Sequence, residues 1–115
     1  LIEKAIKYFN NDSFWLVAPY KVFDNGVERR LVTLENNTEA LLITYKTGGS
    51  TPGDSYLWLL DNAGKPKAFK MWTSILPIDG LEASWADWTT LDSGAQLPTF
   101  HKLLLLGIEI TDIKT

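Results

Sequence analysis

The glycine-rich segment at residues 48–54 is the first part of this sequence whose residue types and spacing could do chemistry. Gly48 and Gly53 are separated by four residues, like the two glycines of a phosphate-binding loop. Asp54, however, stands where that motif places a lysine, and a carboxylate would repel phosphate. The residues that follow have the composition of a strand, whereas the motif requires a helix. The sequence therefore argues against nucleotide binding.

Nucleophilic catalysis is a second chemistry that this loop could suggest. Gly48-x-Ser50 resembles the first half of a nucleophile elbow, but Pro52 stands where that motif needs glycine, and no helix is expected to follow. A Ser-His-Asp set would have to combine His101, the one histidine, with a loop serine and Asp54. A lone histidine is more often a partly buried strand or turn residue. We therefore expect no acyl-transfer activity.

Carboxylates offer a third chemistry, because sugar hydrolysis needs two carboxyl groups that face each other across a cleft. The segment at residues 77–92 carries a group of acidic residues, namely Asp79, Glu82, Asp87 and Asp92. Asp54 and Asp61 flank one expected strand. Aspartates at turns and strand ends are the common explanation for this pattern. A sugar hydrolase is the least favoured hypothesis, and we expect the protein not to be an enzyme.

Tryptophan is the compositional anomaly, with five residues in a chain of 115. Trp85 and Trp88 are three apart, so in a regular strand they point to opposite faces, one in the core and the other partly exposed, unless a bulge intervenes. The indoles either fill the space between a curled sheet and a helix, or line a concave pocket for an apolar or sugar-like ligand. The candidate pocket residues are Trp58, Met71, Trp72, Trp85, Trp88 and Leu106. A second region of functional interest is the loop formed by Gly48, Gly49, Thr51, Pro52, Gly53 and Asp54.

Composition excludes several classes of function. The mass of 13.0 kDa fits one domain over residues 1–115, and a net charge of -3 gives no basic surface for nucleic acid. There is no cysteine and one histidine, so we expect no disulfide and no metal site. The longest apolar run, residues 103–106, is far too short to cross a bilayer. The chain opens at Leu1, which suggests the C-terminal part of a longer protein.

The periodicity of apolar residues predicts the elements that must position these side chains. Leu1, Ile2, Ala5, Ile6 and Phe9 recur at helical spacing, and the polar residues at 10–12 should end a helix that covers residues 1–10. Alternating and two-sided apolar runs then predict strands at 13–17, 20–23, 27–34, 40–45, 55–60, 66–75, 83–91 and 101–113. The expected fold class is α+β and mainly β: a curled, meander-like antiparallel sheet, or half-barrel, of about seven or eight strands with one N-terminal helix.

The last predicted strand has a regular pattern of large aliphatic residues. Leu104, Leu106, Ile108 and Ile110 occupy alternate positions and should share one face of the sheet.

Several segments together resemble the C-terminal half of a family of uncharacterised bacterial secreted proteins and lipoproteins with no assigned activity. They are FWLVAPYKV at 14–22, GGSTPGDSYLW at 48–58, KMW at 70–72, PIDGLE at 77–82 followed by Ser84 and Trp85, and the late Pro98, Thr99 and His101. The order of strands and of Trp-rich hairpins is in turn similar to the lipoprotein-carrier (LolA/LolB-like) half-barrel.

This resemblance implies a curled sheet whose apolar inner face is closed by helices and holds acyl chains without a cofactor. It also implies a location in the periplasm or at the outer membrane. The chain is much shorter than a complete carrier, so an exposed apolar face, or self-association that hides it, is expected. The leading hypothesis is non-enzymatic binding of a lipid or lipid-modified protein in the bacterial envelope. The alternative is an interaction module whose apolar face packs on a partner chain, on a second copy, or on a missing N-terminal half.

Overall fold

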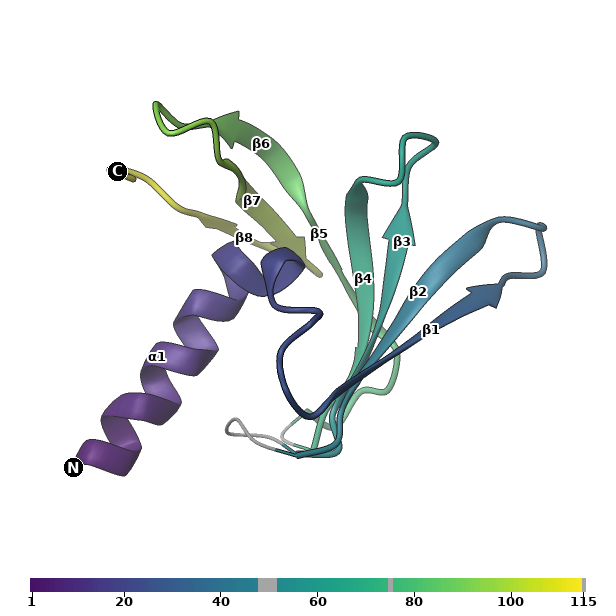
Figure 1. Ribbon diagram of the computed structural model, residues 1–115, viewed down its shortest axis with the longest axis horizontal. Helices are drawn as coiled ribbons and strands as arrows, with labels where there is room; N and C mark the ends of the chain where they lie inside the picture. Colours follow the sequence, from purple (N-terminus) through teal and green to yellow (C-terminus); the bar gives the residue numbers. More distant parts are fainter. Residues whose placement is uncertain (48–51, 75, 115) are drawn as a thin grey trace.

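A computed structural model describes residues 1–47, 52–74 and 76–114 of the chain (Figure 1). One helix, α1 (Ile2–Val17), and one turn of 3-10 helix, η1 (Ala18–Tyr20), precede the strands. The strands are β1 (Val27–Thr33), β2 (Glu39–Tyr45), β3 (Ser55–Leu60), β4 (Pro66–Trp72), β5 (Leu81–Ser84), β6 (Ala86–Thr90), β7 (Gln96–Leu103) and β8 (Leu106–Glu109). They form one open antiparallel sheet, so the predicted class of a mainly β fold with one N-terminal helix is confirmed.

The sheet is a meander in which most strands pair with their neighbours in sequence. β1 to β5 follow one another in order, β7 pairs with both β5 and β6, and β8 pairs with the other side of β7. Three of the hairpins close through the same five-residue turn, at 34–38, 61–65 and 91–95. In each turn the fourth residue has a positive φ, which is 62° at Asn37, 83° at Gly64 and 88° at Gly94. Asparagine and glycine tolerate this conformation best, so the residue types match the turn.

A kink at Trp85 divides the sheet into two arms. A single strand was predicted at 83–91, but β5 ends at Ser84 and β6 begins at Ala86, and Asp87 has a φ of 51°. β5 pairs with β4 and, at Ala83, with β7, whereas among the described residues β6 pairs only with β7. Figure 1 shows β6, β7 and β8 diverging from β1 to β4 on either side of β5. The prediction of one strand was wrong because nothing in the alternation of residue types marks this interruption.

The inner face of the sheet carries two rows of apolar side chains in register. One row runs through Ile43, Tyr56, Met71 and Leu81, which are all buried. The adjacent row contains Leu41, Trp58, Phe69 and Ala83. The C-terminal end of α1 and η1 cover this face, with Phe14, Trp15 and Ala18 packed against the two rows. The core therefore lies between one end of the helix and the concave side of the sheet.

The opposite face of β2 to β4 is also partly apolar, as the two-sided pattern of these strands predicted. Leu42, Leu57 and Leu59 are half-buried there, and Trp72 is exposed to 38%. Phe69 and Met71 lie on the inner face while Lys70 and Trp72 lie on the outer face, so the predicted alternation within β4 is confirmed. Ile75, at the end of that predicted strand, lies outside the described residues.

The N-terminal prediction was wrong beyond residue 10, because α1 continues to Val17. The strands predicted at 13–17 and 20–23 are therefore absent; the first is the last part of α1, and the second falls on η1 and a turn. Asn11 and Asp12 are exposed in the helix, where each costs less than about 1 kcal/mol relative to alanine. Burial of the aromatic rings of Phe14 and Trp15 against the sheet offsets that cost.

The C-terminal prediction of one strand at 101–113 was also wrong. β7 ends at Leu103, a two-residue turn follows, and β8 returns along β7. Leu104 has a φ of 54°, and Leu104, Leu105 and Leu106 are all exposed. The alternation of leucine and isoleucine continues through this turn, so the sequence pattern contains no signal for it.

Candidate functional site

The six residues predicted to line one pocket occupy four different parts of the molecule. Trp58, Met71 and Trp85 are buried in the core, with exposures of 2%, 5% and 2%. Trp72 lies on the outer face of the sheet, against Gly80. Leu106 is exposed to 70% at the start of β8, next to the β7–β8 turn. The fold therefore brings only the three core residues together on the inner face.

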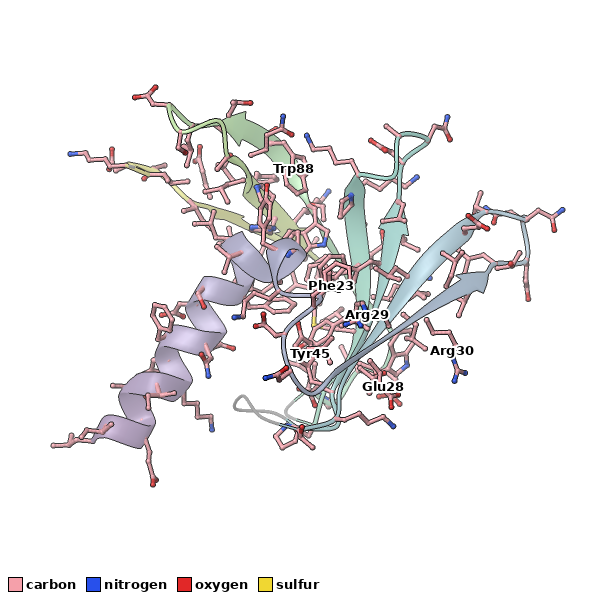
Figure 2. The ribbon with its side chains drawn as sticks, in the orientation of Figure 1. Phe23, Glu28, Arg29, Arg30, Tyr45 and Trp88 are labelled. Carbon is pink, nitrogen blue, oxygen red and sulfur yellow. The ribbon has the colours of Figure 1, made fainter. Side chains whose placement is uncertain are left out.

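Trp88 lies at the margin of the core. Its indole N–H is 3.2 Å from the carbonyl oxygens of both Pro66 and Trp85, and the Lys65 ammonium lies 4.6 Å from its ring centroid. Trp85 is buried and Trp88 is partly buried, so the prediction of one core and one partly exposed tryptophan is confirmed. Figure 2 shows Trp88 on the arm that contains β6 and β7.

The concave surface holds a cluster of aromatic rings from both the sheet and the helix. The Phe14 ring is 4.8 Å from Tyr56, 5.6 Å from Phe69 and 6.0 Å from Trp85, measured between centroids. Trp15 is 5.9 Å from Phe69 and 5.2 Å from His101. Aromatic pairs at such separations stabilise a fold beyond the area that they bury. The side chains of the helix thus take the space that a ligand in this concavity would need.

His101 lies within this cluster and is fully buried. Its Nδ1 is 2.8 Å from the carbonyl oxygen of Ser84, and because a carbonyl can only accept, Nδ1 carries the proton. Nε2 has no partner among the described residues, and the indole N–H groups of Trp58 and Trp85 likewise have none. Burial lowers the pKa of His101 below its ordinary value of 6.5, although hydrogen bonding to the backbone opposes this shift. The imidazole is therefore neutral and is held as a core residue.

The loop predicted to be of functional interest is only partly described. Gly48, Gly49 and Thr51 lie outside the described residues, and Pro52 and Gly53 form an exposed turn. Asp54 is buried, with 3% exposure, and its carboxylate accepts a hydrogen bond of 3.0 Å from the Ser74 backbone N–H. This contact ties the β2–β3 connection to the segment after β4. Asp54 therefore has a structural role in positioning two loops.

Two tyrosines beside this loop are held in their neutral form. Burial, followed by the negative charge of Asp24, raises the pKa of Tyr45 to about 12. Burial also raises the pKa of Tyr56, with smaller contributions from Asp54 and Tyr45. Their rings are 5.7 Å apart and nearly perpendicular. A neutral phenol that ionises only in strong alkali is suited to packing rather than to acid–base chemistry near neutral pH.

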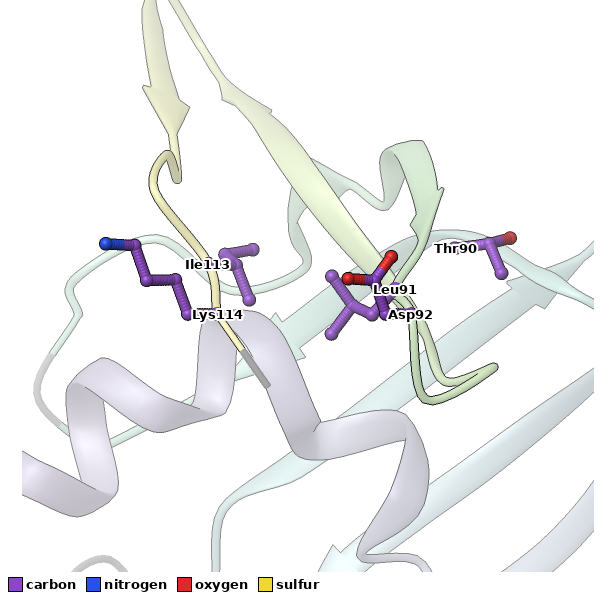
Figure 3. A pocket seen from close by; sticks show the side chains of 5 residues that line it. All are labelled: Thr90, Leu91, Asp92, Ile113 and Lys114. Carbon is purple, nitrogen blue, oxygen red and sulfur yellow. The ribbon is translucent and has the colours of Figure 1, made fainter.

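Two surface depressions lie away from the aromatic cluster. One, of about 340 Å³, lies between the β6–β7 turn and the C-terminal residues (Figure 3). It is lined by Thr90, Leu91, Asp92, Ile113 and Lys114. The other, of about 580 Å³, lies over β1 and β2 and is lined by Val27, Glu28, Arg29, Arg30, Leu42, Thr44 and Lys46. None of the six predicted pocket residues lines either depression.

An apolar surface is exposed along α1. Ile2, Ala5, Ile6 and Phe9 form what we call the outer face of α1, and they are all exposed, the three larger ones to 78%, 53% and 71%. At 3.6 residues per turn, these positions lie on the opposite side of the helix from Phe14, Trp15 and Ala18. Figure 1 shows the N-terminal half of α1 projecting away from the sheet. The sequence identified these apolar positions, but it gave no signal that the sheet would leave them uncovered.

The face of α1 that continues toward the N-terminus from the buried aromatic residues is polar. It carries Lys4, Lys7 and Asn11, which are exposed. Docking more of the helix on its own sheet would therefore bury polar groups and still leave the outer face of α1 in water. α1 thus has one apolar face packed on this chain's core and a second apolar face that is exposed.

The described residues contain no group of histidine and acidic side chains that could hold a metal ion. No helix among them has both the length and the apolar character needed to span a bilayer. Comparison with protein-family models, with curated proteins and with solved structures finds no match for this chain.

Proposed function

We propose that this chain is a protein-interaction module that binds a partner protein through the outer face of α1. The observation that carries the proposal is the exposure of Ile2, Ile6 and Phe9 on the side of α1 that faces away from the sheet. Contiguous exposed apolar residues bordered by polar ones are typical of protein contact sites. A helix that presents residues at i, i+3, i+4 and i+7 fits an apolar groove in a partner. Ile2, Ala5, Ile6 and Phe9 have this spacing.

The energetics of the helix support the same proposal. Only the end of α1 nearest η1 contacts the core, so residues 2–9 gain little from packing within the chain. Short helices without such packing are marginal in water. A partner that covers the outer face would bury three large side chains at about 1.5–3 kcal/mol each when burial is complete. Binding would then stabilise the part of the helix that the sheet does not.

A site-specific photo-crosslinker tests the proposal in the cells that make this protein. A benzophenone amino acid at Phe9 should give a crosslinked product of defined mass, whereas the same group at Lys4, on the polar face, should not. Combining the crosslinker at Phe9 with Ile6→Asp should abolish the product without changing the circular dichroism spectrum. Equal crosslinking at both positions, or none at Phe9, would contradict the proposal.

Binding of an apolar ligand on the concave face is a second candidate, and the aromatic rows of the inner face favour it. Only a short segment of α1 and η1 covers these rings, so displacement of Phe14 and Trp15 would expose a surface suited to an acyl chain. The periplasmic or outer-membrane location that the sequence resemblance implies would suit such a ligand. Native mass spectrometry with added palmitate should then show a bound species. Unliganded masses at saturating palmitate would count against this candidate.

A further inference from the structure

β1 forms a free edge of the sheet. The backbone N–H and C=O groups of alternate residues on its outer side point toward the position that another strand would take. Among the described residues, β1 pairs with β2 and with no other strand. Lys46 N–H donates to the Gly26 carbonyl at 2.8 Å, and Leu34 N–H donates to the Thr38 carbonyl at 2.8 Å. Because hydrogen-bonded residues alternate along an antiparallel ladder, the groups of even-numbered residues point toward β2. The N–H and C=O groups of Arg29, Leu31 and Thr33 therefore point outward. Those of Val27 do so too, but the Val27 N–H already donates to the Asp24 carbonyl at 3.2 Å, so the bonds to a further strand centre on Arg29 and Leu31.

The side chains of β1 carry a charge pattern that can complement itself. Glu28 and Arg30 are exposed and lie on the same face of the strand, two residues apart. Glu28 Oε2 is also 3.6 Å from Lys46 Nζ of its own chain, an exposed ion pair, and the carboxylate has a second oxygen that can accept from another cation. Figure 2 shows Arg30 extending away from the sheet, with Glu28 beside it. An antiparallel copy of the strand presents the same two residues in reverse order. The opposite charges can then meet across a two-fold axis.

We propose that β1 pairs antiparallel with β1 of a second copy of this chain, about a two-fold axis at Arg29. Glu28 of each copy then faces Arg30 of the other, and Val27 faces Leu31. The Glu28–Arg30 pairs fall at non-hydrogen-bonded positions, where facing side chains are closest. The two open sheets become one continuous sheet. This interface is separate from the outer face of α1 and does not depend on it.

The charges select this register over its neighbours. Moving the axis to Arg30 would place the two Arg30 side chains opposite each other, and like charges directly opposite destabilise a sheet. Moving it to Leu31 would place Glu28 opposite Leu34 and leave Arg30 opposite Val32. Of these three registers, only the one centred on Arg29 places Glu28 of each copy opposite Arg30 of the other. It is therefore the register that the sequence of β1 favours.

Arg29 does not obstruct the axis, because its side chain is turned back onto its own chain. Its guanidinium lies 4.6 Å from the centroid of the Phe23 ring and donates to the Val22 carbonyl at 2.6 Å. It also donates to the Val27 carbonyl at 3.4 Å, and that oxygen keeps a second lone pair for a partner strand. Figure 2 shows Arg29 beside Phe23. The two positive charges at the axis are thus directed away from each other.

Charge exchange tests the proposal by sedimentation velocity on the full chain. The wild type should dimerise, and Glu28→Arg or Arg30→Glu alone should weaken the dimer roughly tenfold or more, because two attractive pairs become repulsive. An equimolar mixture of the two variants should restore association as a heterodimer, and so should the double variant. Phe9→Ser, on the outer face of α1, should leave the dimer unchanged. A monomeric wild type at millimolar concentration, or variants with unchanged association, would overturn the proposal and assign the charges to keeping the edge unpaired.

Cysteine crosslinking tests the register separately, since the chain has no cysteine of its own. Leu31→Cys combined with Val27→Cys should form intermolecular disulfides under mild oxidation, because these residues face each other. Leu31→Cys alone should not, since the two copies of Leu31 lie four residues apart along the paired strands. Efficient dimers of the single variant would assign a different register and overturn the one proposed. Circular dichroism of each variant checks that it folds.

Discussion

At the scale of single residues, His101 is the clearest example of a side chain whose type suggests catalysis but whose position in the structure assigns it to the core. Its one satisfied nitrogen donates to Ser84, and the rings of Trp15 and Trp85 each lie 5.2 Å from the imidazole. No serine hydroxyl contacts it among the described residues. The sequence predicted that a lone histidine is more often a partly buried strand residue; it lies on β7, and its burial is complete.

The buried imidazole should make stability depend on pH. Burial lowers the pKa of His101 in the folded protein below 6.5, so the unfolded chain binds the proton more readily. Its contribution to stability is therefore complete above pH 6.5 and declines as the pH falls through 6.5 toward the folded pKa. Urea titrations between pH 7.5 and 5 should show a decreasing free energy of unfolding. The variant His101→Phe should show a smaller decrease over the same range, and an equal slope in both proteins would refute this origin.

At the scale of elements, residue types mark several turns but do not mark the interruptions of strands. Asn36-Asn37, Asp61 to Gly64 and the Pro77 to Gly80 segment contain residues with a physical preference for turns, so their positions could be read from the sequence. The kink at Trp85 and the turn at Leu104 fall inside runs that have the pattern of a continuous strand, and the positive φ at Leu104 is one that leucine seldom adopts. Tertiary packing decides both positions, and the periodicity of a single sequence carries no information about that packing.

The turn at Asn37 offers a direct test of this reasoning. Asn37 has a φ of 62°, and asparagine tolerates that region better than alanine does. Asn37→Ala should destabilise the protein by about 1 kcal/mol, whereas Asn37→Gly should be neutral or slightly stabilising. Glu35→Ala, in the same turn and exposed, is the matched control and should change little. Thermal or urea unfolding measures all three, and equal effects of alanine and glycine would contradict the argument.

The distinction between local residue preference and tertiary packing also applies to α1. The residues at 10–12 have the composition of a helix end, yet the helix passes through them because Phe14 and Trp15 find the concave face of the sheet. Local preference amounts to a few tenths of a kcal/mol at each position, and burial of an aromatic side chain is worth several times more. The sequence could show which residues of this segment are apolar. It could not show that they divide between two sides of one helix.

At the scale of the whole molecule, the two faces of α1 should differ sharply in their effect on stability. Trp15→Ala should destabilise the isolated chain by about 3–5 kcal/mol where its ring is well packed, because it removes a ring from the aromatic cluster. Phe9→Ala should change the free energy of unfolding by no more than about 0.5 kcal/mol, since Phe9 is 71% exposed. Chemical denaturation of the two variants provides the comparison. Similar losses would mean that the outer face of α1 is covered in solution.

The fold class could be predicted from the sequence, whereas the candidate site could be predicted only in part. Two-sided apolar strands separated by turn residues predict a mainly β meander, which the structure has. The tryptophans predict a concave aromatic surface, and Trp58 and Trp85 lie on it. What covers that surface depends on where α1 docks, because the same indoles would line a pocket if Phe14 and Trp15 lay elsewhere. The placement of α1 thus decides whether these indoles form part of the core or line a binding site.

The meander order also bears on how quickly the chain can reach its native state. Most strand pairs form between neighbours in sequence, and several are closed by loops of five residues, at 34–38, 61–65 and 91–95. Short loops lose little chain entropy on closure, so each hairpin can form early and independently. Low contact order is associated with fast folding. We therefore expect the sheet to assemble hairpin by hairpin, with the docking of the helix as the late step that locks the two arms together.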